Sequence, residues 1–114
     1  MEMLKGLLAA VLSLTAVGAA GAADAYPDKP VRVYVGFAPG GATDLLARLY
    51  AKKLGERFNQ TFIVENRPGA GGNIAIQALT QAPADGYIIA MAANYVAANA
   101  AMKRNPYDLS LIHI

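Results

Sequence analysis

Two glycine-rich stretches in this 114-residue sequence each stand between an apolar run and a helix-like segment. The first, FAPGGATD, spans residues 37–44, and the second, ENRPGAGGN, spans residues 65–73. Glycine lets another group approach the backbone closely, and the N–H groups at a helix start carry partial positive charge. Two such helix starts placed side by side can hold an anion, most simply a carboxylate.

Each stretch also has a purely structural interpretation. Taken alone, Gly40 and Gly41 are more typical of a tight turn between a strand and a helix. Asp44 either complements the dipole of the helix that it begins or contacts an amine or hydroxyl of a ligand. Arg67 is either a solvated loop charge or a clamp for a carboxylate. The occurrence of two glycine-rich loops at equivalent places favours the binding-site interpretation.

Alternating strand-like and helix-like segments position these loops. Short runs rich in β-branched and aromatic residues, bounded by turn residues, predict strands at residues 31–37, 61–65 and 87–92. Helices are expected between and after them, at residues 43–58, 73–81 and 94–102. This order predicts an α/β fold in which a parallel sheet with right-handed crossovers has helices on both faces. Ligands of such sheets bind beyond the carboxyl ends of the strands, where both glycine-rich loops lie.

The first expected helix has large apolar residues at helical spacing. We expect these side chains to form its buried face: Leu46, Leu49, Tyr50, Leu54 and Phe58. Charged residues are available for its exposed side: Arg48, Lys52, Lys53 and Glu56.

The first 25 residues have the pattern of an export signal. Lys5 precedes an apolar stretch at residues 6–17, and small residues follow. The apolar core has about a dozen residues, fewer than the roughly 20 that span a bilayer, so we expect a cleaved signal peptide and a periplasmic product. The small residues allow cleavage at three places, of which we favour the last: after Ala22, Ala23 or Ala25.

Composition excludes several classes of function. The formal net charge is only +2, and basic residues are not clustered as nucleic-acid binding requires. The absence of cysteine excludes disulfides, thiolate metal sites and thiol catalysis. The sequence has no recognisable Ser/His/Asp set, paired carboxylates or metal-ligand cluster, so we expect no enzyme, metal or cofactor. His113 is the only histidine, and we assign it no catalytic or metal-binding role.

The enzymatic alternative is the dinucleotide-binding domain of an oxidoreductase, because GAGGNIA follows an expected strand and opens a helix. The fingerprint of such domains needs a small residue where this chain has Ile74, and no acidic residue ends the next strand as a ribose partner. A phosphate-loop NTPase is excluded, since neither loop continues into Gly-Lys-Ser/Thr.

Four motifs stand at specific spacing in the part of the chain from residue 26 to about residue 108: YPDKPVR, FAPGGATD, VENRPGAGGNI and ADGY. In this combination they resemble the N-terminal part of the substrate-binding receptors of tripartite tricarboxylate transporters, also called Bug-type solute receptors. The resemblance implies one three-layer lobe of a type II-like periplasmic binding protein, a Venus flytrap whose second lobe is missing here. It further implies a monomer that captures a small tricarboxylate, dicarboxylate or related organic acid and delivers it to membrane transporter subunits.

The resemblance also implies which residues bind the ligand. In the family pattern, the two glycine-rich loops hold a carboxylate through backbone groups and ordered water. The matching positions are Ala38, Pro39, Gly40, Gly41, Thr43 and Asp44 in the first loop, and Ala70, Gly71 and Gly72 in the second. Asp44 corresponds to a position that can contact the other end of the ligand.

Two departures from the family pattern concern the third loop and the end of the chain. The family often has Ser or Thr hydroxyls after the third strand, whereas MAANYVAANAAM leaves Asn94 as the nearest polar candidate, so the choice of carboxylate is open. After NPYD the family continues into a second lobe, whereas residues 109–114 read LSLIHI. That tail resembles a translated sequencing adapter, and we expect it to be non-native. A truncated product without a function of its own is therefore a third hypothesis.

Overall fold

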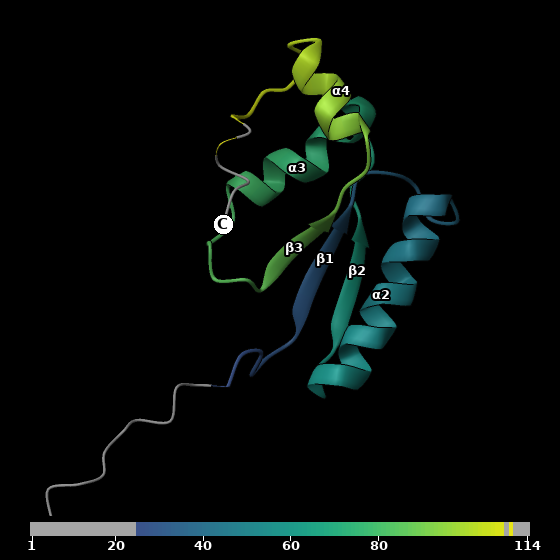
Figure 1. Cartoon of the computed structure of the whole chain (residues 1–114), viewed down its shortest axis with the longest axis vertical. Helices are drawn as coiled ribbons and strands as arrows, with labels where there is room; N and C mark the ends of the chain where they lie inside the picture. Colours follow the sequence, from purple (N-terminus) through teal and green to yellow (C-terminus); the bar gives the residue numbers. More distant parts are fainter. Residues whose placement is uncertain (1–24, 109, 111–114) are drawn as a thin grey trace, which may run out of the picture.

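The computed structural model describes residues 25–108 and 110 (Figure 1). The expected signal peptide and most of the expected non-native tail lie outside the described residues, and both stay predictions. Within the described part, no helix is long and apolar enough to cross a membrane. The elements follow in the order β1 (Val31–Val35), α2 (Ala42–Phe58), β2 (Phe62–Asn66), η1 (Ala70–Gly72), α3 (Asn73–Thr80), β3 (Ile88–Met91) and α4 (Tyr95–Ala101).

The three strands form one parallel sheet in the order β2–β1–β3. Val33 in the central strand pairs with Val64 on one side and with Ile89 on the other. Val31 and Val35 are completely buried, as expected for the strand that has neighbours on both edges. Because the strands are parallel, all three carboxyl ends lie at the same edge of the sheet.

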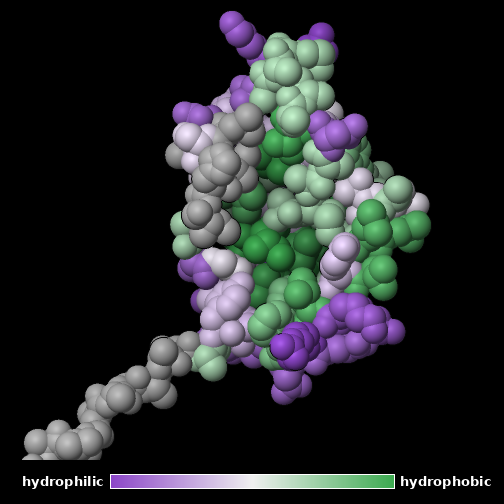
Figure 2. All heavy atoms as spheres, viewed as in Figure 1, coloured by the Kyte–Doolittle hydropathy of each residue, from purple (hydrophilic) through white to green (hydrophobic). Residues whose placement is uncertain are grey.

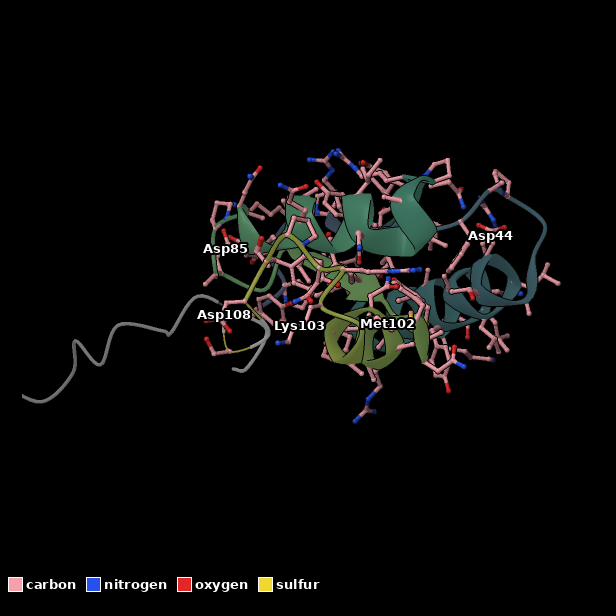
Figure 3. All side chains as sticks on the ribbon, turned by 90° about the horizontal axis from the view of Figure 1, so that it is seen from above. Asp44, Asp85, Met102, Lys103 and Asp108 are labelled. Atoms are coloured by element: carbon pink, nitrogen blue, oxygen red, sulfur yellow. The ribbon has the colours of Figure 1, made fainter. Side chains whose placement is uncertain are left out.

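The helices α2 and α3 lie on opposite faces of this sheet (Figures 1 and 3). The chain passes from β1 to β2 in one direction and from β2 to β3 in the other, so right-handed crossovers place the two helices on opposite faces. Helix α2 contacts β1 and β2, whereas α3 contacts β1 and β3. The predicted three-layer α/β architecture is confirmed.

All six predicted elements are present. The predicted first strand is two residues too long, because Gly36 and Phe37 already belong to the loop. The other predicted boundaries differ from the observed ones by at most one residue at each end. The short 3-10 turn η1 was not predicted.

The predicted buried face of α2 is wrong. Four of its five large apolar residues are exposed, and only Leu54 is half-buried: Leu46, Leu49, Tyr50 and Phe58 are the exposed ones. The buried positions are Asp44, Ala47 and Ala51, which follow one another at helical spacing. Small side chains let α2 lie close to the sheet, where Ala47 packs against Val33 and Val35.

The core is only partly covered on the α2 side of the sheet. A groove of about 340 Å³ between α2 and β3 is lined mostly by apolar side chains: Val33, Ala47, Tyr50, Ala51, Leu54, Ile89, Ala90 and Met91. Figure 2 shows hydrophobic side chains gathered at the surface in the middle of this face. In the described part of the chain β3 is also an edge strand, so its outer backbone groups have no neighbouring strand.

An open apolar groove of this kind should bind an apolar dye such as ANS. We expect the purified chain to enhance ANS fluorescence and Tyr50→Ser, which removes a groove-lining ring, to lower that enhancement by about half or more. Leu45→Ser is the matched control, because Leu45 is exposed on the same helix but does not line the groove. Equal effects of the two substitutions in a fluorescence titration would contradict the assignment of the dye site.

Candidate functional site

The loops that follow the three strands meet at the carboxyl edge of the sheet. The first loop leads from β1 to α2, the second from β2 through η1 to α3, and the third from β3 to α4. The first two approach each other closely, since a Cβ atom on Gly36 would lie 2.8 Å from the Cα atom of Gly72. The structure therefore brings the loop after β1 against the second glycine-rich stretch at Gly36 and Gly72, and neither contact position has room for a side chain.

Tyr95, the first residue of α4, fills the space beside these glycines. A Cβ atom on Gly72 would overlap the Tyr95 ring, and one on Gly36 would lie 3.2 Å from its hydroxyl oxygen. The ring also packs edge-to-face against Phe37, with 5.1 Å between the ring centroids. The Tyr95 hydroxyl is buried and has no hydrogen-bond partner among the described residues, and burial raises its pKa. The third loop thus reaches the other two through an aromatic ring.

The first loop turns at Pro39 and Gly40 and enters α2 without a side-chain cap. Gly40 has a φ of +95°, which favours glycine. Gly41 has an extended conformation, with φ −76° and ψ 172°, and no side chain caps the helix that follows it. Ala38 to Gly41 are exposed, and Thr43 is half-buried. The first N–H groups of α2 are therefore available to an anion at this point.

The second loop has a left-handed backbone over four consecutive residues. The φ angles of Gly69, Ala70, Gly71 and Gly72 are 128°, 49°, 62° and 91°. Only Ala70 carries a side chain in this run, as expected for a conformation that glycine adopts without steric cost. Neither η1 nor α3 has a side-chain cap in the described structure. Ala70 and Gly71 are exposed, whereas Gly72 is buried against Tyr95.

Hydrogen bonds of the Asn73 side chain hold the second loop in place. This side chain is buried and donates a hydrogen bond to the carbonyl oxygen of Arg104 at 2.8 Å. Its Oδ1 atom accepts hydrogen bonds from Asn99 at 2.9 Å and from the Tyr107 hydroxyl at 3.1 Å. Asn99 also donates to the carbonyl oxygen of Gly71 at 3.2 Å. This network ties the second loop to α4 and to the segment that follows it.

Asp44 lies at the start of α2 (Figure 3), and it anchors the first loop in a comparable way. Its side chain is only 2% exposed, and its carboxylate accepts hydrogen bonds from Arg48 Nε at 2.9 Å, Asn66 Nδ2 at 2.8 Å and the Gly40 N–H at 3.0 Å. The hydrogen bond from Arg48, with those from Asn66 and Gly40, holds the pKa of Asp44 well below its usual range. Direct contact of Asp44 with a ligand stays a prediction.

The guanidinium of Arg67 packs over Tyr34 of the central strand. Its guanidinium carbon lies 4.2 Å from the centroid of the Tyr34 ring, and its Nη2 atom lies 3.4 Å from Glu65. Glu65 also pairs with Arg32, whose Nη2 atom donates to it at 2.8 Å, and this hydrogen bond lowers the pKa of Glu65. Arg67 is therefore packed against Tyr34 and paired with Glu65 while 37% of its side chain is exposed, and its role as a carboxylate clamp stays a prediction.

Asn94, the candidate of the third loop, is exposed at the N-terminus of α4. No hydrogen bond in the described part of the chain joins its side chain to the other two loops. Sequence reasoning missed the residues that organise the site: Arg48, Asn66, Asn73, Tyr95 and Asn99. The spacing of Asp44 and Arg48 is a usable signal for a helical ion pair, whereas Asn66 binds groups 22 and 29 residues away.

Comparison with known sequences gives several relatives. Residues 46–113 match the tripartite tricarboxylate transporter family receptor. A UPF0065 protein of Bordetella pertussis is 41% identical over 85 residues, which are 75% of this chain and 26% of the relative. Protein BugT of the same organism is 35% identical over 94 residues, 82% of this chain and 29% of the relative. This chain spans less than a third of the length of either relative.

Solved structures with similar folds include periplasmic binding protein BugD, with a TM-score of 0.55 and 43% identity over 57% of this chain and 22% of that chain. R. palustris Rpa4515 with adipate has a TM-score of 0.56 and 45% identity, with the same coverage. A TctC solute binding protein from Polaromonas has a TM-score of 0.68 and 30% identity over 72% of this chain and 28% of that chain.

The hydrogen bonds of Asp44 predict a stability that depends on pH. Because folding lowers the pKa of this carboxyl, its contribution is present above the unfolded value of about 3.9 and is lost as pH falls below it. We expect Asp44→Asn to lower the melting temperature at neutral pH and to lower it less at about pH 3. Asp85→Asn, at an exposed carboxyl, is the control. A loss of equal size at both pH values in thermal unfolding would contradict this role.

The contact between Gly72 and Tyr95 predicts that alanine substitutions at the neighbouring glycines Gly71 and Gly72 differ in how much they destabilise the fold. Gly71 and Gly72 both have positive φ, but only Gly72 lies against the Tyr95 ring. We expect Gly72→Ala to destabilise the fold more than Gly71→Ala by about 1–3 kcal/mol, the usual cost of overpacking. Chemical denaturation measures both values. In a Tyr95→Ala background the difference should largely disappear, and its persistence would exclude the ring as the cause.

Proposed function

The chain belongs to the tripartite tricarboxylate transporter receptor family, and from that premise we propose that it binds a small organic acid through its two glycine-rich loops. The family consists of solute-binding receptors, and we propose neither a catalytic role nor a cofactor. The observation that carries the proposal is the contact of the two loops at Gly36 and Gly72, at the same edge of the sheet as the uncapped start of α2.

A carboxylate is the ligand group that fits this arrangement best. The uncapped start of α2 offers backbone N–H groups and the positive end of a 17-residue helix. The exposed backbone of the second loop at Ala70 and Gly71 supplies further polar groups at the same edge. We propose that the loop residues named above hold the carboxylate through these groups and ordered water.

The proposed substrate class is a short aliphatic dicarboxylate or a related organic acid. R. palustris Rpa4515, whose structure is described with adipate, is 45% identical to this chain over the matched region. One carboxylate would lie at the glycine-rich loops, and the rest of the ligand would extend toward the third loop. Asn94 is the proposed contact for the other end of the ligand, and Asp44, which is 2% exposed and accepts the Gly40 N–H, is proposed to act at the carboxylate end by orienting the first loop.

The remaining parts of the proposal concern the whole receptor. We propose export to the periplasm by a signal peptide at residues 1–25, a first lobe at residues 26–108 and a monomeric state. Closure of a second lobe over the ligand and delivery to membrane transporter subunits complete the proposed mechanism.

Substitution of Gly41 tests the first loop. A valine is compatible with the extended backbone, and the nearest atom to the added Cβ would be 4.0 Å away, so the fold should persist. The branched side chain would block approach to the helix start. We expect adipate to shift amide signals of both loops in two-dimensional NMR of the purified chain, and Gly41→Val to weaken binding about tenfold or more.

The control for this experiment is Ala84→Val, which adds the same side chain at an exposed position before β3. Affinity equal to that of the unmodified chain in folded Gly41→Val would remove the first loop from the site. If no di- or tricarboxylate shifts any loop signal of the unmodified chain, the carboxylate proposal is wrong.

A further inference from the structure

We propose that Asn66 is a positioning residue of the carboxylate site. Its side-chain amide holds the first glycine-rich loop against the end of β2, where the second glycine-rich loop begins. The effect of Asn66 on ligand binding rests on the function proposed above. The effect of Asn66 on the first loop does not, because these contacts are made within the chain. Asn66 was not among the residues that the sequence indicated.

The side chain of Asn66 uses both ends of its amide. Its Nδ2 atom donates to the carbonyl oxygen of Phe37 at 2.9 Å and to Asp44 Oδ1 at 2.8 Å. Its Oδ1 atom accepts a hydrogen bond from Arg48 Nη2 at 3.2 Å. Phe37 lies near the start of the first loop, and Asp44 lies in the first turn of α2. One amide group therefore holds both ends of the first loop.

The backbone of Asn66 links the side chain that holds the first loop to the start of the second loop. Asn66 is the last residue of β2 and pairs with Val35 of the central strand. The next residue, Arg67, donates its N–H to the carbonyl oxygen of Val35 at 2.7 Å. The second glycine-rich loop starts directly after it, at Pro68. The amide of Asn66 thus sets where the first loop stands relative to the start of the second.

The effect of Asn66 reaches the ligand side of the loop through Asp44. Asn66 holds Asp44 Oδ1, while the other carboxylate oxygen accepts the Gly40 N–H at 3.0 Å. Without the Asn66 amide, the carboxylate keeps Arg48 as its main partner, and Arg48 is a half-exposed side chain that can move. We expect the Gly40 amide and the neighbouring N–H groups at the start of α2 to lose their fixed orientation.

An amide is required because the position needs two donors and one acceptor in a planar group. Serine is shorter and carries a single donor. Aspartate has nearly the same shape but no donor when ionised, and it would place a second negative charge beside Asp44 and beside the Phe37 carbonyl. Such a pair of carboxylates has one raised pKa, so a proton should be taken up as pH falls.

Among the described residues, few charged groups lie close to the side chain of Asn66. Arg48 of α2 and Asp44 are the charged groups that form hydrogen bonds with its side chain. Its sequence neighbours Glu65 and Arg67 contact each other. Glu65 also pairs with Arg32, and Arg67 also stacks on Tyr34 of the central strand. A pH response of an aspartate at this position would therefore report on its pairing with Asp44 and Arg48.

The first test needs no ligand. Amide hydrogen exchange by NMR measures the protection of the Gly40 N–H in the unmodified chain, in Asn66→Ser and in Asn66→Asp. We expect protection to fall about fivefold or more in Asn66→Ser, equivalent to one lost hydrogen bond. In Asn66→Asp we expect a loss at about pH 8 and a partial recovery at about pH 5.5. Asn59→Asp adds the same charge at the opposite end of α2 and should leave Gly40 unchanged.

The second test measures adipate affinity in the same four proteins at both pH values, each variant compared with the unmodified chain at the same pH. The affinities should follow the order of Gly40 protection, and only Asn66→Asp should regain affinity at the lower pH. A residue that merely stabilised the fold would change the folded fraction and leave the affinity of the folded fraction unchanged.

The two tests separate failure of this proposal from failure of the proposed function. Unchanged Gly40 protection in folded Asn66→Ser overturns the role of Asn66, whatever the chain binds. Altered protection in a chain that binds no carboxylate overturns the proposed function and limits Asn66 to positioning the loop. If Asn66→Asp does not fold, Asn66→Ser decides the first test, and the affinity of Asn66→Ser decides the second.

Discussion

The buried carboxylate of Asp44 is the interaction on which the carboxyl edge of this sheet depends. A charge that is 2% exposed is stable only where hydrogen-bond donors replace the water that it has lost. Gly40 of the first loop, Arg48 of α2 and Asn66 of β2 supply these donors. Because each comes from a different part of the fold, satisfying one carboxylate fixes a loop, a helix and a strand relative to one another. The same requirement turns the Asp44 face of α2 toward the sheet and leaves large apolar side chains outside.

The contact of Gly36 with Gly72 is a second constraint, and it acts between backbones. The parallel sheet brings the loops after β1 and β2 to one edge, but they touch only because neither position carries a side chain. Tyr95 then packs against Gly72 and against Phe37. The loop after β3 is joined to the other two by this ring. Topology thus gives the common edge, and two glycines and a tyrosine give the actual contacts.

The sequence predicts the parts of this structure that depend on local pattern. Strand and helix positions follow from apolar runs and turn residues, and the glycine-rich loops are visible in the composition itself. The prediction of the buried face of α2 was wrong because the large apolar side chains outweighed Asp44 in the sequence pattern. The hydrogen bonds of Asp44 decide the orientation of the helix. Asn66 and Tyr95 could not be found this way. Asn66 binds residues 22 and 29 positions away, and the packing of Tyr95 depends on a glycine in another loop.

A carboxylate held at this edge would meet peptide groups rather than a guanidinium. The arginines nearest to the two loops in sequence are engaged elsewhere, Arg48 with Asp44 and Arg67 with Glu65 and Tyr34. Backbone N–H groups and a helix dipole attract any carboxylate of suitable size and discriminate little between organic acids. Selectivity then depends on groups that contact the rest of the ligand. In this chain the third loop offers two alanines and Asn94, so small changes there should alter which acid is bound while the carboxylate end stays the same.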